Sequence, residues 1–510
     1  MNKKITQIHF RLKTISVLNL MFLFTILFLL NSCGTEPKDE LTKKIKIALR
    51  NDNTIDEKEW TEFIEYSIEN KQDFTDLIDA DNKINNQKLT ELITSIANKR
   101  RDKQEPKIFN PKKEEEEEND DKKAIINVFI ENSGSMDGYV RGTTEFEAAL
   151  SDLLVQIQYK YDTENLNINF INTKIYPSKV DEVNNFVETL EPSKKPYKVG
   201  NRSVSKLNEI LEIILDSTNQ NNISILISDC IYSLDKGKDT EGALEFQKSL
   251  TKGAFLEKSK EFNFSTIVLK MNSKFDGTYY DKNNAKTKLS RKERPYYFWI
   301  IGQDKLIEIF QEKINLKNLK GFENSYYLSN SQENKQPFYT ILKSTNKIGK
   351  FRPIDKKTKI LKSINDIEYE NGTFQFAIAI DLENIPVDET YLFDTKNYVV
   401  PDGFSVVSIE EIERNNLNKN DFTRISKTTA THFITVKINR DVEIQDLKLE
   451  LSNKIPSWVK ESNSIDDRDV KKQLDKTFGL LYLIQGVSEA YTTQNPNNKS
   501  YFNINITIKK

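Results

Sequence analysis

Three side chains near residue 130 carry oxygen atoms at a spacing that suits metal binding. Glu131, Ser133 and Ser135 place a carboxylate and two hydroxyls at every second residue. Residues 124–130 form a continuous apolar run, which predicts a buried strand just before them. In a parallel sheet, ligands bind beyond the carboxyl ends of the strands. Oxygen donors on such a turn suit a hard cation, so Mg²⁺ or Mn²⁺ is the expected cofactor.

The rare residue types restrict the chemistry that is open to the chain. The cysteines are Cys33 and Cys230, and the histidines are His9 and His432. His9 lies in an N-terminal leader, residues 1–32, so the mature chain cannot assemble a zinc site from cysteine and histidine. A nucleophilic triad would have to use His432, which lies in a strand-like run and is expected to be structural. No phosphate-binding glycine loop or G-x-S-x-G elbow occurs, and we expect no enzyme.

Alternating strand and helix patterns surround the oxygen-rich segment. Apolar runs predict strands at residues 124–130, 166–171, 174–177, 223–227, 264–270 and 296–301. Helical spacing predicts helices at residues 146–161, 183–190, 205–215, 241–258 and 305–314. This alternation predicts an α/β fold with a doubly wound, mostly parallel, Rossmann-like sheet.

The oxygen-rich segment resembles the D-x-S-x-S motif of von Willebrand factor A (vWA) domains, which begins a metal-ion-dependent adhesion site (MIDAS). The resemblance covers about residues 124–315. It implies two further ligands: Ser203, in the turn 200–203 before a helix, and Asp229, which ends a strand. The implied metal site consists of Glu131, Ser133, Ser135, Ser203 and Asp229. In this family a carboxylate from a partner protein completes the metal shell, which implies a role in protein binding and adhesion.

Two departures from the vWA pattern bear on the metal. The first ligand position holds Glu131 instead of aspartate, and its extra methylene moves the carboxylate outward. The third loop offers Ser203 instead of threonine, with Arg202 beside it. A guanidinium at that position can compete with a metal for the carboxylate. The sequence therefore leaves two alternatives, a divalent site or a fixed pair between Glu131 and Arg202.

The N-terminus has the features of a lipoprotein signal peptide, expected to span residues 1–32. A basic segment precedes the apolar residues 21–30, a stretch too short to span a membrane. The next residues, Leu-Asn-Ser-Cys at 30–33, resemble a lipobox, which implies lipidation of Cys33. We therefore expect an exported outer-membrane lipoprotein. Lys38-Asp39-Glu40 resembles a surface-export signal, and both surface and periplasm-facing locations remain open.

The charge of the chain argues against a nucleic-acid partner. The formal net charge is −2, and loss of the four basic residues of the leader changes it to −6. A nucleic-acid binder normally presents a strongly basic surface. The expected partners are therefore a protein that offers a carboxylate, and the membrane through the lipid on Cys33.

Composition shifts divide the rest of the chain. Residues 33–100 are expected to form a tether and a small helical module, followed by a charged linker at 101–123. The vWA-like domain should span residues 124–315, with a connector at 316–349. Alternating runs predict a β-rich, sandwich-like domain at residues 350–510, interrupted by one helix at residues 478–490.

Three functions compete at this point. The first is a lipid-anchored envelope protein whose vWA-like domain binds a partner protein. The second is a structural envelope component that needs no metal. The third is a hydrolase in which Glu131, Asp137 and Asp229 hold magnesium, because doubly wound sheets host many chemistries.

Overall fold

The computed structural model describes residues 36–51, 53–78, 83–100, 106–109, 124–161, 163–178, 183–203, 206–234, 239–329, 336–354, 360–383, 385, 387–439, 446–496 and 499–509. The chain divides into two compact units, Met1–Glu118 and Asn119–Lys510. The expected signal peptide and Cys33 lie outside the described residues, as do residues 101–105 and 110–123 of the expected linker. Within the described ranges, no helix is long and apolar enough to cross a membrane.

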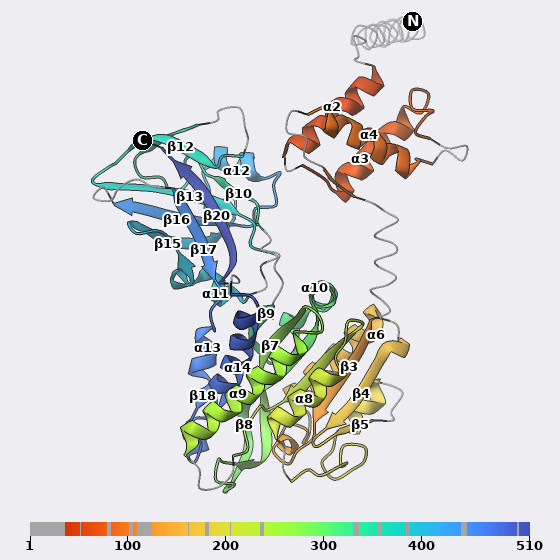
Figure 1. Cartoon of the computed structure of the whole chain (residues 1–510), viewed down its shortest axis with the longest axis vertical. Helices are drawn as coiled ribbons and strands as arrows, with labels where there is room; N and C mark the ends of the chain where they lie inside the picture. The colour runs from red at the N-terminus through yellow and green to blue at the C-terminus, as the bar shows by residue number, and fades with distance from the viewer. Residues whose placement is uncertain are drawn as a thin grey trace, which may run out of the picture. The chain divides into compact units, whose positions relative to one another are not determined.

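The first unit is a small helical module (Figure 1). Its elements are α2 (Pro37–Asn51), α3 (Glu57–Glu69), α4 (Asn86–Asn98) and a parallel pair of short strands, β1 (Thr54–Ile55) and β2 (Lys107–Ile108). Asp56 caps α3 by accepting a hydrogen bond from the backbone N–H of Glu59 at 2.7 Å. Trp60, Ile45 and Ile93 are buried in a common core that joins the three helices.

The second unit contains a seven-stranded mixed sheet. Its strands are β3 (Ile125–Glu131), β4 (Leu166–Ile171), β5 (Ile175–Pro177), β6 (Asn222–Ser228), β7 (Phe264–Tyr280), β8 (Lys286–Gln303) and β9 (Phe322–Ser329), in the order β5-β4-β3-β6-β8-β7-β9. The neighbours β4, β3 and β6 are parallel, and every other neighbouring pair is antiparallel. The prediction of a mostly parallel sheet is therefore confirmed only for β4, β3 and β6. Beside β6, the β7–β8 hairpin adds an antiparallel strand, β8.

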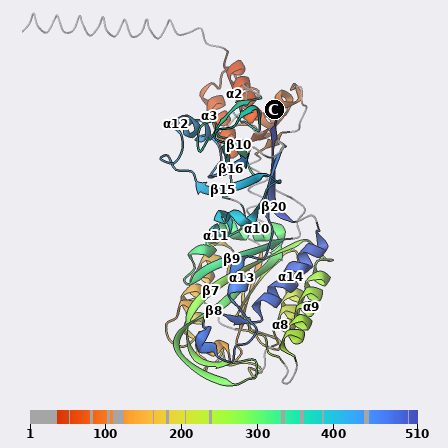
Figure 2. The same cartoon turned by 90° about the vertical axis from the view of Figure 1, so that its left-hand side faces the viewer.

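Helices cover both faces of this sheet (Figures 1 and 2). One apolar cluster joins the sheet to α6 (Glu145–Lys160), α7 (Val183–Glu188) and α10 (Asp304–Lys313). A second joins the opposite face to α8 (Leu207–Ser217), α9 (Thr240–Lys258) and α14 (Leu480–Gln494). The central strands are apolar on both faces for this reason.

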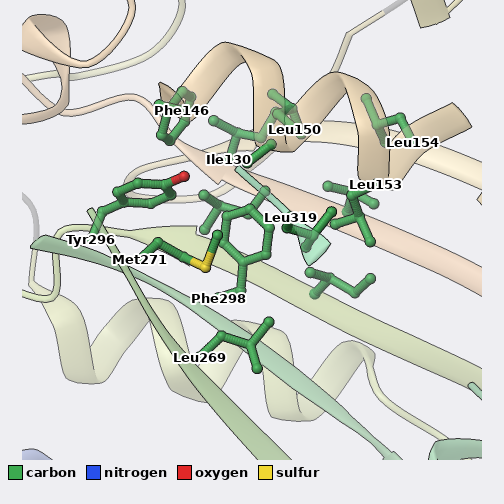
Figure 3. Packing of buried hydrophobic residues seen from close by; sticks show 14 of the residues in the cluster. Ile130, Phe146, Leu150, Leu153, Leu154, Leu269, Met271, Tyr296, Phe298 and Leu319 are labelled. Carbon is green, nitrogen blue, oxygen red and sulfur yellow. The ribbon is translucent and has the colours of Figure 1, made fainter. Parts of the chain in front are cut away.

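The strand before the oxygen-rich segment is anchored in the first of these clusters. Ile126, Val128 and Ile130 of β3 are fully buried there, and Phe129 points into the other cluster. Figure 3 shows Ile130 packed among side chains of α6 and of the strands β7 and β8. Each such side chain stabilises the fold by about 1.5–3 kcal/mol when buried. The end of β3, and with it Glu131, is therefore held firmly in place.

The expected connector at residues 316–349 is corrected by the structure. It contains η3 (Leu316–Asn318), then β9, then β10 (Tyr339–Ile341). Strand β9 pairs with β7 and completes the seven-stranded sheet, although its half-polar sequence gives little sign of this. Within residues 316–349, the connection from this sheet to the C-terminal strands is therefore limited to the residues between β9 and β10.

The remaining strands form two facing sheets. The first sheet contains β10, β13 (Thr373–Ile380), β16 (His432–Asn439) and β15 (Phe404–Glu411). The second contains β11 (Lys350–Pro353), β12 (Ser363–Glu368), β20 (Ser500–Ile508), β17 (Leu447–Ser452) and β14 (Tyr398–Val399). Side chains from both sheets share one apolar core, so the region has a sandwich-like architecture. Two short helices, α11 (Glu389–Phe393) and α12 (Lys419–Ile425), flank it.

The segment 456–496 leaves the sandwich and packs on the other sheet. It holds α13 (Ser457–Glu461), β18 (Asn463–Ser464), η5 (Val470–Lys472), β19 (Thr477–Phe478) and α14. The sequence places the helix near residue 480 inside the β-rich domain, but its apolar side chains lie in the core of the seven-stranded sheet. The chain then returns to the sandwich as β20.

Candidate functional site

The carboxyl ends of β3, β4, β6 and β7 point to the same edge of the seven-stranded sheet. The loop after β3 lies at this edge and contains η1 (Met136–Gly138). Asn132 fixes that loop to its neighbours. Its side-chain amide donates to the backbone oxygens of Tyr197 at 2.7 Å and Val199 at 3.0 Å, and its oxygen accepts from Asn172 at 2.8 Å. The edge is therefore rigid around Glu131.

Two carboxylates are buried together at this edge. Glu131 and Asp229 are each 3 % exposed. Glu131 accepts a hydrogen bond from Ser228 Oγ, and Ser228 Oγ in turn accepts from the backbone N–H of Cys230 at 2.8 Å. Burial, and then the negative charge of Glu131, raise the pKa of Asp229 to about 7. The two carboxylates are thus close enough to repel each other.

The two motif serines connect to this carboxylate pair. The Oγ atoms of Ser133 and Ser135 are 2.9 Å apart, within hydrogen-bond distance. Ser135 also lies near the Asp229 side chain and lowers the pKa of that carboxyl, as does the backbone N–H of Ile231, which donates to Asp229 Oδ1 at 3.2 Å. Glu131, Ser133, Ser135 and Asp229 therefore form one polar cluster from two strand ends.

Ser203, the fifth expected ligand, takes part in a different set of contacts. Its side chain is exposed, and its hydroxyl donates to Asn201 Oδ1 at 2.6 Å inside its own turn. The turn itself borders the cluster, because the backbone N–H of Gly134 donates to the backbone oxygen of Arg202 at 3.0 Å. The structure thus brings the loop to the site without directing the hydroxyl of Ser203 into the cluster.

The structure contradicts the alternative in which Arg202 pairs with Glu131, because Arg202 pairs with Asp137 instead. Arg202 donates to the carboxylate of Asp137, to the backbone oxygen of Asn132 at 2.7 Å and to that of Pro192 at 3.2 Å. Its guanidinium also lies 5.0 Å from the ring centre of Tyr197. This loop arginine can reach Asp137 because η1 turns that residue toward it. Arg202 therefore belongs to a structural network, and Asp137, a ligand in the hydrolase hypothesis, already has a cationic partner.

The β7–β8 hairpin, whose extension beyond the sheet was not predicted from the sequence, covers one side of the site. Residues of β7 after Lys270 extend roughly 30 Å beyond the end of β6, at about 3.3 Å per residue. Figure 2 shows this long, curved pair. Phe275 packs edge-on against Tyr139 with ring centres 5.0 Å apart, and Tyr139 donates to the backbone oxygen of Pro295 at 2.6 Å. The alternation of polar and apolar residues around Phe275 was the available signal.

A buried arginine of this hairpin lies near enough to Asp229 for its charge to act on that carboxyl. Arg294 is 1 % exposed, and its charge lowers the pKa of Asp229. Its Nη1 donates to the backbone oxygens of Leu474 at 3.0 Å and Lys476 at 2.9 Å. Its Nη2 has no hydrogen-bond partner among the described residues. Arg294 is thus held by backbone oxygens, and among the described residues no ion pair joins it to Asp229 or Glu131. Within the described part of the chain, the two buried carboxylates therefore lack a directly paired cation.

The donor set fits a hard divalent cation. The cluster offers two carboxylates and two hydroxyls, which are oxygen ligands of the kind that Mg²⁺ and Mn²⁺ prefer. In the part of the chain that the structure describes, no three histidine, cysteine, aspartate or glutamate side chains gather as a metal site. The cluster is therefore a low-carboxylate site, suited to weak binding that a further anionic ligand would strengthen.

Comparisons with known proteins found no matching protein-family model, no matching curated protein and no matching solved structure.

Proposed function

We propose that the chain is a lipid-anchored cell-envelope protein that binds a partner protein through a vWA-like domain with a divergent MIDAS. The fold supports this proposal in its central part. Strands β4, β3 and β6 are parallel, helices cover both faces, and the motif comes directly after the central strand β3. That is the position at which a doubly wound sheet binds ligands.

One observation carries the proposal: Asp229 lies close to Glu131, Ser133 and Ser135 at the carboxyl edge of the seven-stranded sheet. These four side chains would hold Mg²⁺ or Mn²⁺, whose charge would offset the repulsion between the two carboxylates. Buried like charges are costly unless a counter-charge compensates them. A carboxylate from the partner protein would complete the shell, and Ser203 would contribute only after its turn rearranges.

Two variants test the metal site. Asp229→Ala removes one of two carboxylate ligands, so Mn²⁺ affinity should fall by at least about tenfold. Electron paramagnetic resonance of free Mn²⁺, titrated into the full chain, measures this affinity. Asp216→Ala, an exposed carboxylate on α8, is the matched control and should bind like the wild type. Equal affinities of wild type and Asp229→Ala would favour the metal-free structural alternative.

The anchor is tested separately. Because Leu30-Asn31-Ser32-Cys33 resembles a lipobox, Cys33→Ala should abolish metabolic labelling with a fatty-acid analogue and release the protein from the membrane fraction. Cys230→Ala, at the buried cysteine of the sheet, should leave labelling unchanged. Acyl labelling that persists in Cys33→Ala would exclude the lipoprotein assignment.

A further inference from the structure

Two basic loops flank the candidate site in a chain whose net charge is −2. The hairpin segment 271–296 contains seven basic and three acidic residues. The turn segment 191–203 contains four basic residues and one acidic residue, Glu191. The carboxyl edge of the sheet is therefore positively charged at its rim, while the motif at its centre is negative.

Several of these basic residues are already engaged. Lys274 pairs with Glu145 at 3.3 Å and Lys282 with Asp466 at 3.6 Å. Six others are exposed and form no ion pair with a described residue: Lys195, Lys198, Lys286, Lys288, Arg291 and Lys292. The three acids of the hairpin do not neutralise them. Asp281 accepts from the backbone N–H groups of Asn283 and Ala285 in its own turn.

Lys198 borders the motif from one side. The backbone oxygens of Tyr197 and Val199, its two neighbours, both accept from the side chain of Asn132. Asn132 is the residue directly after Glu131, so the backbone of Lys198 is held beside the motif while its side chain is exposed. Its exposed side chain therefore extends from a backbone segment that borders the motif.

Lys286 borders the motif from the hairpin. It pairs with Tyr280 across β7 and β8, and its Nζ lies 5.6 Å from the Tyr280 ring centre. The Tyr280 ring lies against Gly134, since a Cβ built there would be 3.9 Å from the phenol oxygen. Tyr280 therefore lies between Lys286 and Gly134, the residue that separates the two motif serines.

We infer that the partner presents an acidic segment, with several aspartate or glutamate residues, and that Lys198 and Lys286 receive its flanking carboxylates. This inference rests on the proposed function, in which one partner carboxylate meets the metal at the motif. A lone carboxylate would leave the exposed cations on both sides without a role. Complementary charges at a rim accelerate association and select the partner, and their effect weakens as salt screens them.

Peptide binding tests the inference on the full chain in Mg²⁺. The probe is a labelled peptide of alternating aspartate and glycine, with an asparagine version as the neutral reference, and fluorescence anisotropy gives Kd. The wild type should bind the acidic peptide and not the neutral one. The double variant Lys198→Glu/Lys286→Glu should weaken binding by about tenfold. The control Lys396→Glu/Lys427→Glu makes the same charge change at exposed lysines of the sandwich and should bind like the wild type.

Failure of this inference is distinguishable from failure of the metal proposal. If Lys198→Glu/Lys286→Glu binds the acidic peptide as well as the wild type, the rim has no role, whether or not Asp229→Ala abolishes binding. The inference would also be overturned if the neutral peptide bound as tightly as the acidic one. The same holds if phosphatidylglycerol vesicles displaced all of the bound acidic peptide, because the surface would then prefer a membrane. If peptide binding depends on the two lysines but not on Mg²⁺ or Asp229, the acidic partner stands and the metal proposal fails.

Discussion

Glu131 and Asp229 are the two residues on which the site depends. Among the described residues, neither carboxylate forms an ion pair with an arginine. Glu131 accepts a hydrogen bond from Ser228, and Asp229 accepts one from the backbone N–H of Ile231. Neutral donors offset only part of the cost of burying two like charges. The fold therefore tolerates the repulsion at this edge, as expected of a site prepared for a cation.

This repulsion predicts how stability depends on pH. Folding raises the pKa of Asp229 from 3.8 to about 7, so the folded protein holds this proton more tightly than the unfolded chain. Protonation of Asp229 therefore contributes to the free energy of unfolding. This contribution is complete below pH 3.8 and is lost as the pH rises through 7. In EDTA at pH 8, Asp229→Asn should therefore be more stable than the wild type, on the order of 4 kcal/mol, at 1.36 kcal/mol for each of the roughly three units of pKa.

The difference should shrink toward pH 5 and reverse in saturating Mg²⁺, because only the wild type gains the binding free energy. Urea unfolding at both pH values, with and without Mg²⁺, measures it. Asp216→Asn on α8 serves as the exposed control. An Asp229→Asn variant that is less stable than the wild type in EDTA at pH 8 would contradict this account of the carboxylate pair.

The motif residues could be predicted from the sequence because each lies next to an apolar run that predicts a strand. Glu131 is the last residue of a strand that is visible as an apolar run, and Ser133 and Ser135 follow it. Asp229 comes directly after the end of another such strand. The partner of Arg202 could not be found in this way. Its choice of Asp137 over Glu131 depends on the turn of η1 and on the ring of Tyr197, which pack together only in three dimensions.

At the scale of elements, two features were not predicted from the sequence: the long β7–β8 hairpin and the packing of α14 on the seven-stranded sheet. The hairpin residues 271–295 mix charged and apolar side chains, because one face packs on the motif loop and the other is exposed. The periodicity of the sequence predicted helix α14, but it did not predict that α14 packs on α9. That partner lies more than 200 residues earlier in the chain, and long-range pairing of this kind has no local signal.

Glycine substitutions test the packing of α14 on α9. A Cβ at Gly486 would lie 2.6 Å from the backbone oxygen of Lys248 and 3.0 Å from Thr251 Cβ. Because a backbone oxygen cannot move without shifting its helix, Gly486→Ala should destabilise the fold by about 1–3 kcal/mol. Urea unfolding of the full chain measures this change.

Gly253→Ala in α9 is the matched control, since a Cβ there meets nothing within 4 Å. Alanine favours a helix over glycine by up to about 1 kcal/mol, so this variant should match or exceed the wild type in stability. If Gly486→Ala were equally harmless, the close approach of the two helices would be wrong.

At the scale of the molecule, the chain crosses between the seven-stranded sheet and the sandwich three times. It leaves the sheet after β9, returns from β17 to α13, and leaves again from α14 to β20. Tyr501 of β20 also donates to the backbone oxygen of Tyr327 of β9 at 3.2 Å. The site-bearing sheet and the sandwich therefore depend on each other for their elements.

This dependence predicts which fragments fold. The sequence-based domain 124–315 lacks β9 and α14, so a fragment of residues 119–315 exposes the core face that α14 covers and should show no cooperative thermal transition. A fragment that joins residues 119–330 to 456–496 through a flexible linker restores both elements and should melt cooperatively. Circular dichroism during heating distinguishes them. Cooperative melting of 119–315 would show that the sheet is complete without the returning segment.

The central claim is that Glu131, Ser133, Ser135 and Asp229 hold one divalent cation. Anomalous diffraction from crystals of the full chain grown with Mn²⁺ tests it most directly, because manganese is located by its own scattering. The account predicts a single strong anomalous peak among the side-chain oxygens of these four residues, with Arg202 still bonded to Asp137. Ordered side chains without a peak at this position, or with Arg294 bonded directly to Asp229 in its place, would contradict it.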